Sequence, residues 1–352
     1  MGALLSEPVT AMVVQSCSAD GWVGSIAEMQ GWRRTHEDAS IFCEAGHGAE
    51  ECAVFAVLDG HGGQAAAIES AALLQDSLLK LARRGTMAAA VATRELELAF
   101  LEADARLRER LPPEDKSGST VVAAIITRPR PSEYCVQLAH CGDSRAIVCR
   151  GDGLVCSEDH KPGRQDESDR IRAAGGSVMR GPLGGPLRVD GALAVSRAMG
   201  DFAYKLREAD PAQCKVSAMP EVSTVTGCKA GDWVFIACDG IFDVMNNEEV
   251  HGFVQPRLLR EKPGPADGGK IVTDLLRHCL EKGSKDNCTA CLVQLQPGCP
   301  VQPPSKKLLQ GGFAKASPEV REKYAEFISS HGFSVDGLAG CSAARSSAAS
   351  PA

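Results

Sequence analysis

Acidic side chains stand at the ends of strand-like runs in this sequence, where a rigid element could hold a metal ion. Residues 53–58 are apolar and run directly into Asp59, which opens an Asp-Gly-His-Gly-Gly turn. An apolar run bounded by turn residues is typical of a strand buried on both faces. The carboxylate of Asp59 could therefore bind a hard cation, and the glycines would let a backbone carbonyl approach the same ion. Taken alone, the stretch fits an ordinary strand that ends in an Asp-Gly turn equally well.

Two more acids, Glu37 and Asp38, come directly before a second strand-like run at 39–43. In an antiparallel pair, the start of one strand lies beside the end of the other. Glu37 and Asp38 would then share a sheet edge with Asp59. Three carboxylates at one place are costly unless a cation neutralises them, so this edge is a candidate metal site.

The same arrangement recurs later in the chain. The apolar run 233–238 leads into Asp239, and Asp286 comes just before the strand-like run 288–295. A chance distribution of acids would not place them at so many strand ends. The sequence therefore predicts two sheets that meet at one shared acidic cleft.

Other stretches predict the elements that surround the cleft. Residues 64–84 and 88–110 are rich in Ala and Leu with apolar residues at helical spacing, and residues 268–282 form a third predicted helix. These helices would cover the core. Residues 161–190 are rich in Gly, Pro and Arg, so we expect a surface flap with a mobile or irregular tip at 181–186.

We expect the main folded domain at residues 23–296, between two less regular ends. Residues 1–22 have the pattern of a loose N-terminal arm. Residues 297–352 would form a linker, a short helix at 318–329 and a disordered tail rich in Ala, Ser and Gly.

The composition narrows the function further. The chain has 38 Lys+Arg against 45 Asp+Glu, and a net charge of −7 argues against a general nucleic-acid binder. Its 15 cysteines are an odd number and many lie in apolar runs, so we expect a reducing compartment and no disulfide framework. Cys288 and Cys291 have redox-motif spacing, but they lie in a strand-like run without a second pair, which favours a buried structural pair.

Six motifs occur in an order that closely resembles the metal-dependent type 2C serine/threonine protein phosphatases, the PPM family. They are Glu37-Asp38, Asp59-Gly60-His61-Gly62-Gly63, Gly142-Asp143-Ser144-Arg145, the segment Ser196–Asp201, Asp239-Gly240 and Asp286-Asn287. The similarity extends from about Met29 to Leu295, so it covers most of the chain.

The resemblance implies an α+β fold, a two-sheet antiparallel β-sandwich with helices on both outer faces (α-β-β-α) and a flap subdomain. It also implies two Mn²⁺ or Mg²⁺ ions in the cleft, and oxygen-only ligands suit these ions better than zinc. By motif, Asp59 bridges the two ions and the Gly60 carbonyl completes one site. Asp239 and Asp286 hold the other.

Further residues surround the metals in the same resemblance. Glu37 and Asp38 orient waters at the metal sites. Arg33 forms bidentate hydrogen bonds with two phosphoryl oxygens of the substrate. His61 protonates the departing serine or threonine alkoxide. Asp143 either joins a weaker third metal site or caps its own turn.

The interpretation is an active enzyme that hydrolyses phosphoserine and phosphothreonine in proteins. A pseudophosphatase that acts as a scaffold or receptor partner is the main alternative. Such a protein would normally lack a metal-binding carboxylate, and Asp59, Asp239 and Asp286 are all present. A third candidate, a metal-dependent hydrolase of small phosphoesters, stays open because only the flap and the surface near Arg33 bear on substrate size.

The first residues match the N-myristoylation pattern, with Gly2 as the acceptor and Ser6 in place, although so short a pattern also matches by chance. Residues 1–32 contain no Lys or Arg, and one acyl chain without a polybasic patch gives only marginal binding. We therefore expect a monomer in the cytoplasm, with the nucleus as a second compartment and weak, reversible membrane contact.

Overall fold

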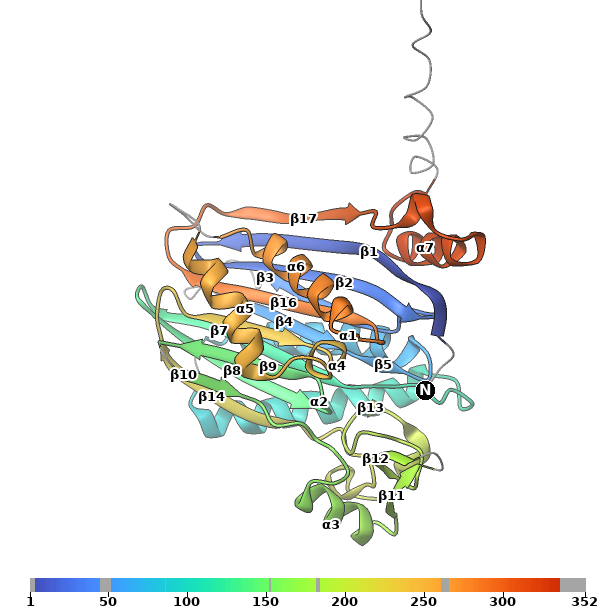
Figure 1. Ribbon diagram of the computed structural model, residues 1–352. Helices are drawn as coiled ribbons and strands as arrows, with labels where there is room; N and C mark the ends of the chain where they lie inside the picture. Colours follow the sequence, from blue (N-terminus) through green and yellow to red (C-terminus); the bar gives the residue numbers. More distant parts are fainter. Residues whose placement is uncertain are drawn as a thin grey trace, which may run out of the picture.

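Two antiparallel sheets pack face to face, and helices cover the outer face of each sheet (Figure 1). The computed structural model describes residues 4–44, 52–85, 87–151, 153–181, 184–260 and 266–335. This architecture is the expected α-β-β-α sandwich, so the predicted fold class is confirmed. None of the helices within these ranges is long and apolar enough to cross a lipid bilayer.

One sheet has five strands in the spatial order β14-β8-β7-β4-β3. Its strands are β3 (Ala39–Glu44), β4 (Cys52–Leu58), β7 (Val121–Arg130), β8 (Glu133–Cys141) and β14 (Glu221–Cys228). Every residue of β4 is buried, as its continuous apolar run predicts. This strand therefore gives the turn that follows it a rigid base.

The second sheet has seven strands in the order β10-β9-β15-β16-β2-β1-β17. They are β1 (Leu4–Ala19), β2 (Gly21–Arg33), β9 (Arg145–Arg150), β10 (Gly153–Cys156), β15 (Trp233–Ala237), β16 (Cys288–Gln296) and β17 (Gln302–Leu309). Large apolar side chains join the two sheets. Trp22 of β2 meets Phe55 of β4 edge to face, with 5.3 Å between the ring centroids.

Helices α1 (Ala65–Ala82) and α2 (Ala89–Arg110) cover the five-stranded sheet, and α5 (Asn247–Arg260) and α6 (Gly268–Glu281) cover the other sheet (Figure 1). Three of the four agree with the predicted helices. α5 was not predicted, because it contains Pro256 and buries only two of its residues, Val250 and Val254.

The interpretation of residues 1–22 as a loose arm is wrong. Residues in this segment form β1, which pairs with β2 on one side and β17 on the other. Successive side chains of a strand face opposite sides. Ala11 and Val13 pack toward the C-terminal helix, while Met12 and Val14 face the opposite side, where Val14 lies against Gly269 of α6. Both faces are covered, so the strand lacks the apolar-polar alternation that would have identified it.

The expected linker after residue 297 is also wrong in part, because it contains β17. The side chains of β17 are mostly exposed, and its Pro and Lys residues are typical of an edge strand. The helix α7 (Pro318–Ser330) agrees with the predicted helix at 318–329, and it buries Val320 and Phe327 against β1. The predicted disordered tail lies outside the described residues.

The flap consists of α3 (Gln165–Ala173) and a hairpin of β11 (Val178–Gly181) and β12 (Gly184–Val189). The expectation of an irregular tip at 181–186 is wrong for residues 184–186, which belong to β12, and residues 182 and 183 are not described. The buried carboxylate of Glu167 accepts hydrogen bonds of 2.7 Å from both Arg170 and Arg197. The bond from Arg197, together with the bond from Arg170 to the carbonyl oxygen of Ser196, fastens the flap helix to the chain segment that returns toward the sandwich.

The cysteines whose side chains are described are free thiols, and all of them except Cys156 are buried. Cys288 and Cys291 lie fully buried in β16. Burial raises the pKa of both thiols well above the usual range, so they stay protonated and unreactive. This agrees with their interpretation as a structural pair.

Candidate metal centre

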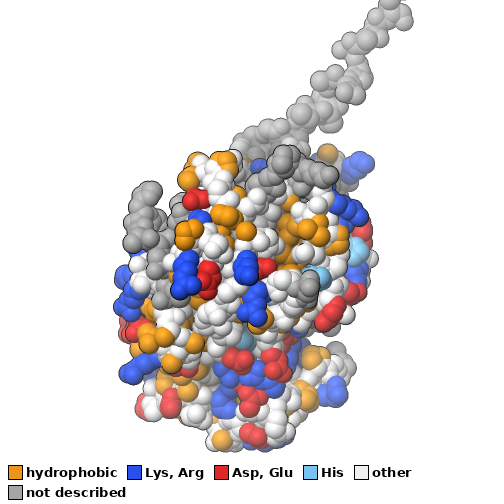
Figure 2. Space-filling view, turned by 90° about the vertical axis from the view of Figure 1, so that its left-hand side faces the viewer, with side chains coloured by type: hydrophobic (Ala, Val, Ile, Leu, Met, Phe, Trp, Pro, Cys, Tyr) orange, Lys and Arg blue, Asp and Glu red, His pale blue; other side chains and the backbone are white. Residues whose placement is uncertain are grey.

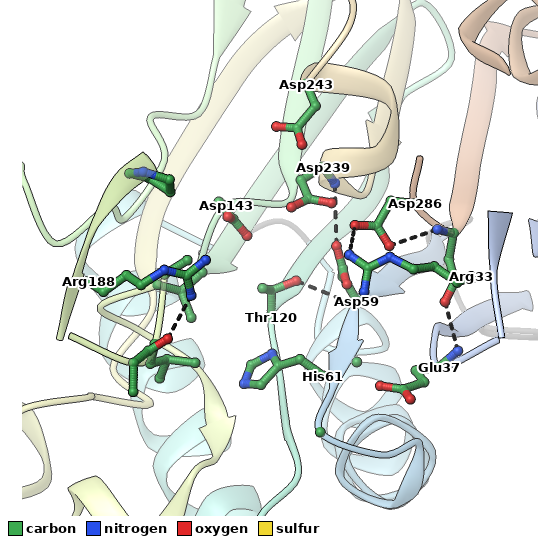
Figure 3. A pocket seen from close by; sticks show the side chains of 18 of the residues that line it. Arg33, Glu37, Asp59, His61, Thr120, Asp143, Arg188, Asp239, Asp243 and Asp286 are labelled. Atoms are coloured by element: carbon green, nitrogen blue, oxygen red, sulfur yellow. Dashed lines mark hydrogen bonds and ion pairs between the residues drawn. The ribbon is translucent and has the colours of Figure 1, made fainter. Parts of the chain in front are cut away.

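A cleft of about 870 Å³ opens between the sandwich and the flap, and predicted acids line it (Figure 3). Each acid comes from a different connection: Glu37 lies between β2 and β3, Asp59 follows β4, Asp143 lies between β8 and β9, Asp239 begins the short helix α4 (Asp239–Phe242), and Asp286 precedes β16. The structure brings these acids together, as their positions at strand ends led us to expect.

Strand register places the acids at 37 and 38 beside Asp59. In the β3–β4 pair, Ala39 lies opposite Leu58. The residues just before Ala39 and just after Leu58 are therefore neighbours at the same sheet edge. The rule for antiparallel strands was sufficient to predict this part of the site.

Glu37 and Asp38 face different surroundings. Glu37 lines the cleft, and its Oε2 accepts a hydrogen bond of 3.1 Å from the backbone N–H of Gly63. Asp38 is buried and does not line the cleft, and its Oδ2 accepts a bond of 2.7 Å from Thr289 Oγ1. Both carboxylates are thus held in fixed orientations by groups of the protein.

Asp59 and Asp239 bring the two sheets into contact at the floor of the cleft. The backbone N–H of Asp239 donates a hydrogen bond of 3.4 Å to Oδ2 of Asp59. The Oδ1 atom of Asp239 is buried and has no hydrogen-bond partner in the described part of the chain. A buried carboxylate oxygen without a donor is unfavourable unless a cation coordinates it. The donor set therefore fits a metal ion.

The electrostatics of the floor support the same conclusion. Burial raises the pKa values of Asp38, Asp59 and Asp239 well above the usual aspartate range, and the neighbouring carboxylates raise them further. Such a group of acids cannot be fully ionised at neutral pH without a compensating positive charge. Divalent cations would supply that charge and stabilise the ionised form.

Two glycines allow the acids to approach so closely. A Cβ atom at Gly60 would lie 2.1 Å from the carbonyl oxygen of Glu37, and a Cβ atom at Gly240 would lie 2.0 Å from the carbonyl oxygen of Asn287. Neither space can hold a side chain, because backbone atoms fill it. Each glycine therefore sets the position of the aspartate that precedes it in the sequence.

Basic side chains contact two of the acids. Arg33 donates a hydrogen bond to Oδ2 of Asp286, and Lys161 donates one to Oδ2 of Asp143. Burial lowers the pKa of Lys161, but the charge of Asp143 outweighs burial and raises the pKa above its ordinary value. Asp143 is 4% exposed, and its Oδ2 forms an ion pair with Lys161. Its two suggested roles, metal ligand and turn cap, stay predictions.

A small three-stranded sheet, in the order β13-β6-β5, places His61 beside Asp201. Its strands are β5 (Gly60–His61), β6 (Gly118–Ser119) and β13 (Met199–Gly200), and Asp201 follows the last of them. His61 Nε2 lies 2.7 Å from Oδ2 of Asp201. Burial lowers the pKa of His61, but the hydrogen bond and charge of Asp201 outweigh burial and raise the pKa.

Sequence reasoning named His61 but not its partner. Asp201 is the last residue of the 196–201 motif, so the signal was present although no role followed from it. Asp243 and Arg188 also line the cleft, and Arg188 reaches it from the flap (Figure 3). Nothing in their local sequence marked these two residues.

Comparisons with known proteins agree with this geometry. Residues 22–288 match the family model for protein phosphatase 2C. A probable protein phosphatase 1N of Mus musculus is 42% identical over 275 residues, which are 77% of this chain and 64% of that protein. A probable protein phosphatase 2C of Caenorhabditis elegans is 37% identical over 309 residues, 85% of this chain and 81% of that protein.

The structural comparison gives the same result. A crystal structure of a phosphatase from Toxoplasma gondii matches with a TM-score of 0.72 at 26% identity, covering 84% of this chain and 99% of that chain. The sequence match spans most of the sandwich, and the acids of the resemblance converge in one cleft. The chain therefore belongs to the protein phosphatase 2C family, the metal-dependent protein serine/threonine phosphatases.

Proposed function

We propose that this chain hydrolyses phosphoserine and phosphothreonine in proteins with two Mg²⁺ or Mn²⁺ ions in the cleft. Asp59 would lie between the ions, the Gly60 carbonyl would complete one site, and Asp239 and Asp286 would hold the other. The buried Oδ1 of Asp239, which lacks a hydrogen-bond partner in the described structure, is the observation that carries the proposal. An all-oxygen donor set suits Mg²⁺ and Mn²⁺.

When bound, such ions would supply an activated water and neutralise charge during an in-line displacement at phosphorus. Glu37 would orient that water from the cleft wall, since its carboxylate is already fixed by the N–H of Gly63 and by Thr35 Oγ1. Asp38 would support the same waters from the buried side, where Thr289 holds it.

Arg33 would bind the phosphoryl group of the substrate. Its side chain is 37% exposed at the cleft, so the guanidinium is accessible from solvent. The planar guanidinium donates two parallel hydrogen bonds, which match two phosphoryl oxygens. Its contact with Asp286 holds the guanidinium at the edge of the acidic floor.

His61 would give a proton to the departing alkoxide. The carboxylate of Asp201 only accepts hydrogen bonds, so the proton of this pair lies on Nε2 of His61. The proton for the leaving oxygen would therefore come from Nδ1. Asp201 is a positioning residue in this account, because it fixes the orientation of the ring.

The two alternatives from sequence are less favoured. A pseudophosphatase would lack part of the acidic floor, yet Asp59, Asp239 and Asp286 all line the same cleft. A site restricted to small phosphoesters would be narrow, whereas this cleft has a volume of about 870 Å³ and includes flap residues. The geometry therefore favours a phosphorylated segment of a protein as the substrate.

The test is an assay of the full chain on phosphoserine and phosphothreonine peptides and on an aryl phosphate, with Mg²⁺, Mn²⁺ or a chelator. We expect peptide hydrolysis that requires Mg²⁺ or Mn²⁺ and stops when the chelator is added. Activity that survives chelation would contradict the metal mechanism. Activity on the aryl phosphate alone would favour small phosphoesters, and inactivity under all conditions would favour the pseudophosphatase.

A further inference from the structure

A second group of metal-ligating side chains lies where α7 meets the sandwich, outside the acidic cleft. It consists of Glu28 in β2, His36 in the loop between β2 and β3, and His331 just after α7. We call these three residues the junction site. One ligand atom from each lies within 4.8 Å of the other two. One ion placed among them could reach all three after small side-chain rotations.

The hydrogen bonds of His331 leave one ring nitrogen to face the site. Its Nδ1 lies 2.7 Å from the carbonyl oxygen of Phe327, and a carbonyl only accepts, so Nδ1 carries a hydrogen. Its Nε2 lies 2.7 Å from Oε2 of Glu28, and a metal ion would replace the proton that this nitrogen shares with the carboxylate and release it to solvent. A metal-binding histidine typically donates its other N–H to a backbone carbonyl or a carboxylate in this way.

Glu28 also has one carboxylate oxygen that faces the junction site. Its side chain is 6% exposed, and its Oε1 accepts a hydrogen bond of 2.7 Å from Ser40 Oγ, which leaves Oε2 for the junction site.

His36 supplies an independent observation. Its Nε2 atom is buried and has no hydrogen-bond partner among the residues described. The ring packs edge to face on Phe327 and His331, with centroid distances of 5.2 and 5.5 Å. The ring is thus held in place by packing, while its nitrogen lacks the partner that a buried polar atom requires.

A hollow open to solvent lies beside the junction site. It has a volume of about 360 Å³, and His36 lines it together with Gln64, Phe327 and Ser330. An ion could enter through this hollow, and a water molecule from it could complete the coordination. Glu37 lines both this hollow and the acidic cleft, so the two sites are neighbours.

We propose that the junction site binds a transition-metal dication such as Zn²⁺ and thereby fastens α7 to the loop that leads into Glu37 and Asp38. Two imidazoles and one carboxylate suit Zn²⁺, whereas the all-oxygen cleft suits Mg²⁺ or Mn²⁺. Different metals would therefore occupy the two sites. The bound ion would join strand β2 to α7, which lies about 300 residues later in the chain. The position of the loop that contains Glu37 and Asp38 would then depend on whether α7 is docked on the sandwich.

The test uses Co²⁺ as a visible probe and Zn²⁺ as its competitor, on the full chain with excess Mg²⁺ in the cleft. We expect a Co²⁺ absorption band typical of nitrogen-containing, low-coordinate sites, saturating at one ion per chain and displaced by Zn²⁺. His331→Ala should weaken this binding at least about 100-fold, since loss of even an outer-shell partner costs 10–100-fold. His36→Ala should weaken it too. Circular dichroism confirms that each variant is folded.

Two control variants separate the junction site from the cleft. Asp59→Asn, which removes a predicted ligand of the cleft, should leave the Co²⁺ band unchanged. His278→Ala, which removes a half-exposed histidine of α6, should also leave it unchanged. Wild-type protein without the band, or a folded His331→Ala variant that binds Co²⁺ normally, would overturn the proposal and show that His331 and Glu28 form only an ion pair. Neither result would affect the proposed phosphatase activity.

Discussion

At the scale of single residues, several acids of the cleft have protein partners, whereas one fully buried carboxylate oxygen has none among the described residues. Asp38 is bound by Thr289, Asp143 by Lys161 and Asp286 by Arg33, whereas Oδ1 of Asp239 has no partner in the described structure. Side chains of the protein thus form hydrogen bonds or ion pairs with carboxylates around the floor. The Oδ1 atom of Asp239 is left open to coordinate a metal ion. This pattern is expected of a metal site and not of an acidic surface that merely faces water.

The role of His61 can be tested with two leaving groups. We predict that His61→Gln lowers turnover of a phosphoserine peptide by about 10²–10⁴-fold, because a serine alkoxide needs a proton. The loss should be much smaller for an aryl phosphate, whose leaving group departs without one. Steady-state rates at saturating metal measure both effects. Asp201→Asn should show the same substrate dependence, whereas equal losses on both substrates would assign His61 to metal or substrate positioning.

At the scale of elements, the strand ends of the cleft were predictable and the outer strands were not. β4 and β15 are continuous apolar runs followed by an acid, so their type and their position at the cleft followed from local pattern. β1 depends on contacts with β17 and α7, which lie far away in the sequence, and the exposed β17 has no apolar run. Local periodicity carries no information about such distant partners.

In the metal centre, too, contacts between neighbouring strands could be predicted from the sequence, and contacts between distant segments could not. Glu37, Asp38 and Asp59 meet because neighbouring antiparallel strands bring them together, and the sequence pattern was enough to predict that. The pairs His61–Asp201 and Asp143–Lys161 depend on the path of the flap segment, and the 196–201 motif that contains Asp201 did not indicate which residue Asp201 contacts. These contacts could be found only in the folded chain.

The flap contains a buried ion-pair group that predicts how stability depends on pH. Burial tends to raise the pKa of Glu167, but hydrogen bonds from Arg170 and Arg197 outweigh it and lower the pKa from 4.5 to about 2. A carboxyl whose pKa is lower in the folded state stabilises the fold above its unfolded pKa, and this contribution is lost as pH falls from about 4.5 toward 2. The contribution at neutral pH is roughly 3 kcal/mol.

We therefore predict that Glu167→Gln destabilises the protein at pH 7 and has a much smaller effect near pH 2. Urea unfolding of the metal-free protein, followed by circular dichroism, measures the difference. Glu281→Gln, at an exposed position on α6, is the control and should change stability little at either pH. A Glu167→Gln variant that loses equal stability at both pH values would contradict the assigned pKa.

The contact between α7 and β1 gives a second prediction at this scale. The hydroxyl of Tyr324 accepts a hydrogen bond of 2.9 Å from the backbone N–H of Thr10 and is buried between the two elements. Tyr324→Phe leaves that N–H without its acceptor, so we predict a loss of about 1–3 kcal/mol in the free energy of unfolding. Chemical denaturation measures it. Tyr204→Phe, in the flap region, is the matched control, and an equal loss there would contradict this account.

At the scale of the whole molecule, strands from the two ends of the described chain lie side by side at one edge of the seven-stranded sheet. β1 pairs with β17, and α7 packs on the face of β1 opposite to the one that α6 covers (Figure 1). On the face in Figure 2, basic and acidic side chains are interspersed and form no continuous basic surface.

Acylation of Gly2 stays a proposal, because Gly2 lies outside the described residues. We propose a monomeric enzyme of the cytoplasm and nucleus with weak, acyl-dependent membrane contact, since a single myristoyl chain gives marginal binding. Mass spectrometry of the N-terminal peptide and fractionation of wild type beside Gly2→Ala test this. We predict a modified Gly2, a mainly soluble pool, and loss of the small membrane pool in Gly2→Ala. An unmodified Gly2 would remove the lipid, and tight retention would reveal a second anchor.

The central claim is that Asp59 joins two metal ions, and calorimetric titration with Mn²⁺ tests it most directly. The reference protein is the His331→Ala variant, which lacks the junction site and is otherwise wild type, and it should bind two Mn²⁺ ions tightly in the cleft. Asp59→Asn should abolish tight binding of both ions and turnover while the fold is retained, and Asp76→Asn on the exposed face of α1 should change neither. If Asp59→Asn bound two Mn²⁺ ions as tightly as wild type and kept near-normal activity, the two-metal assignment would be wrong.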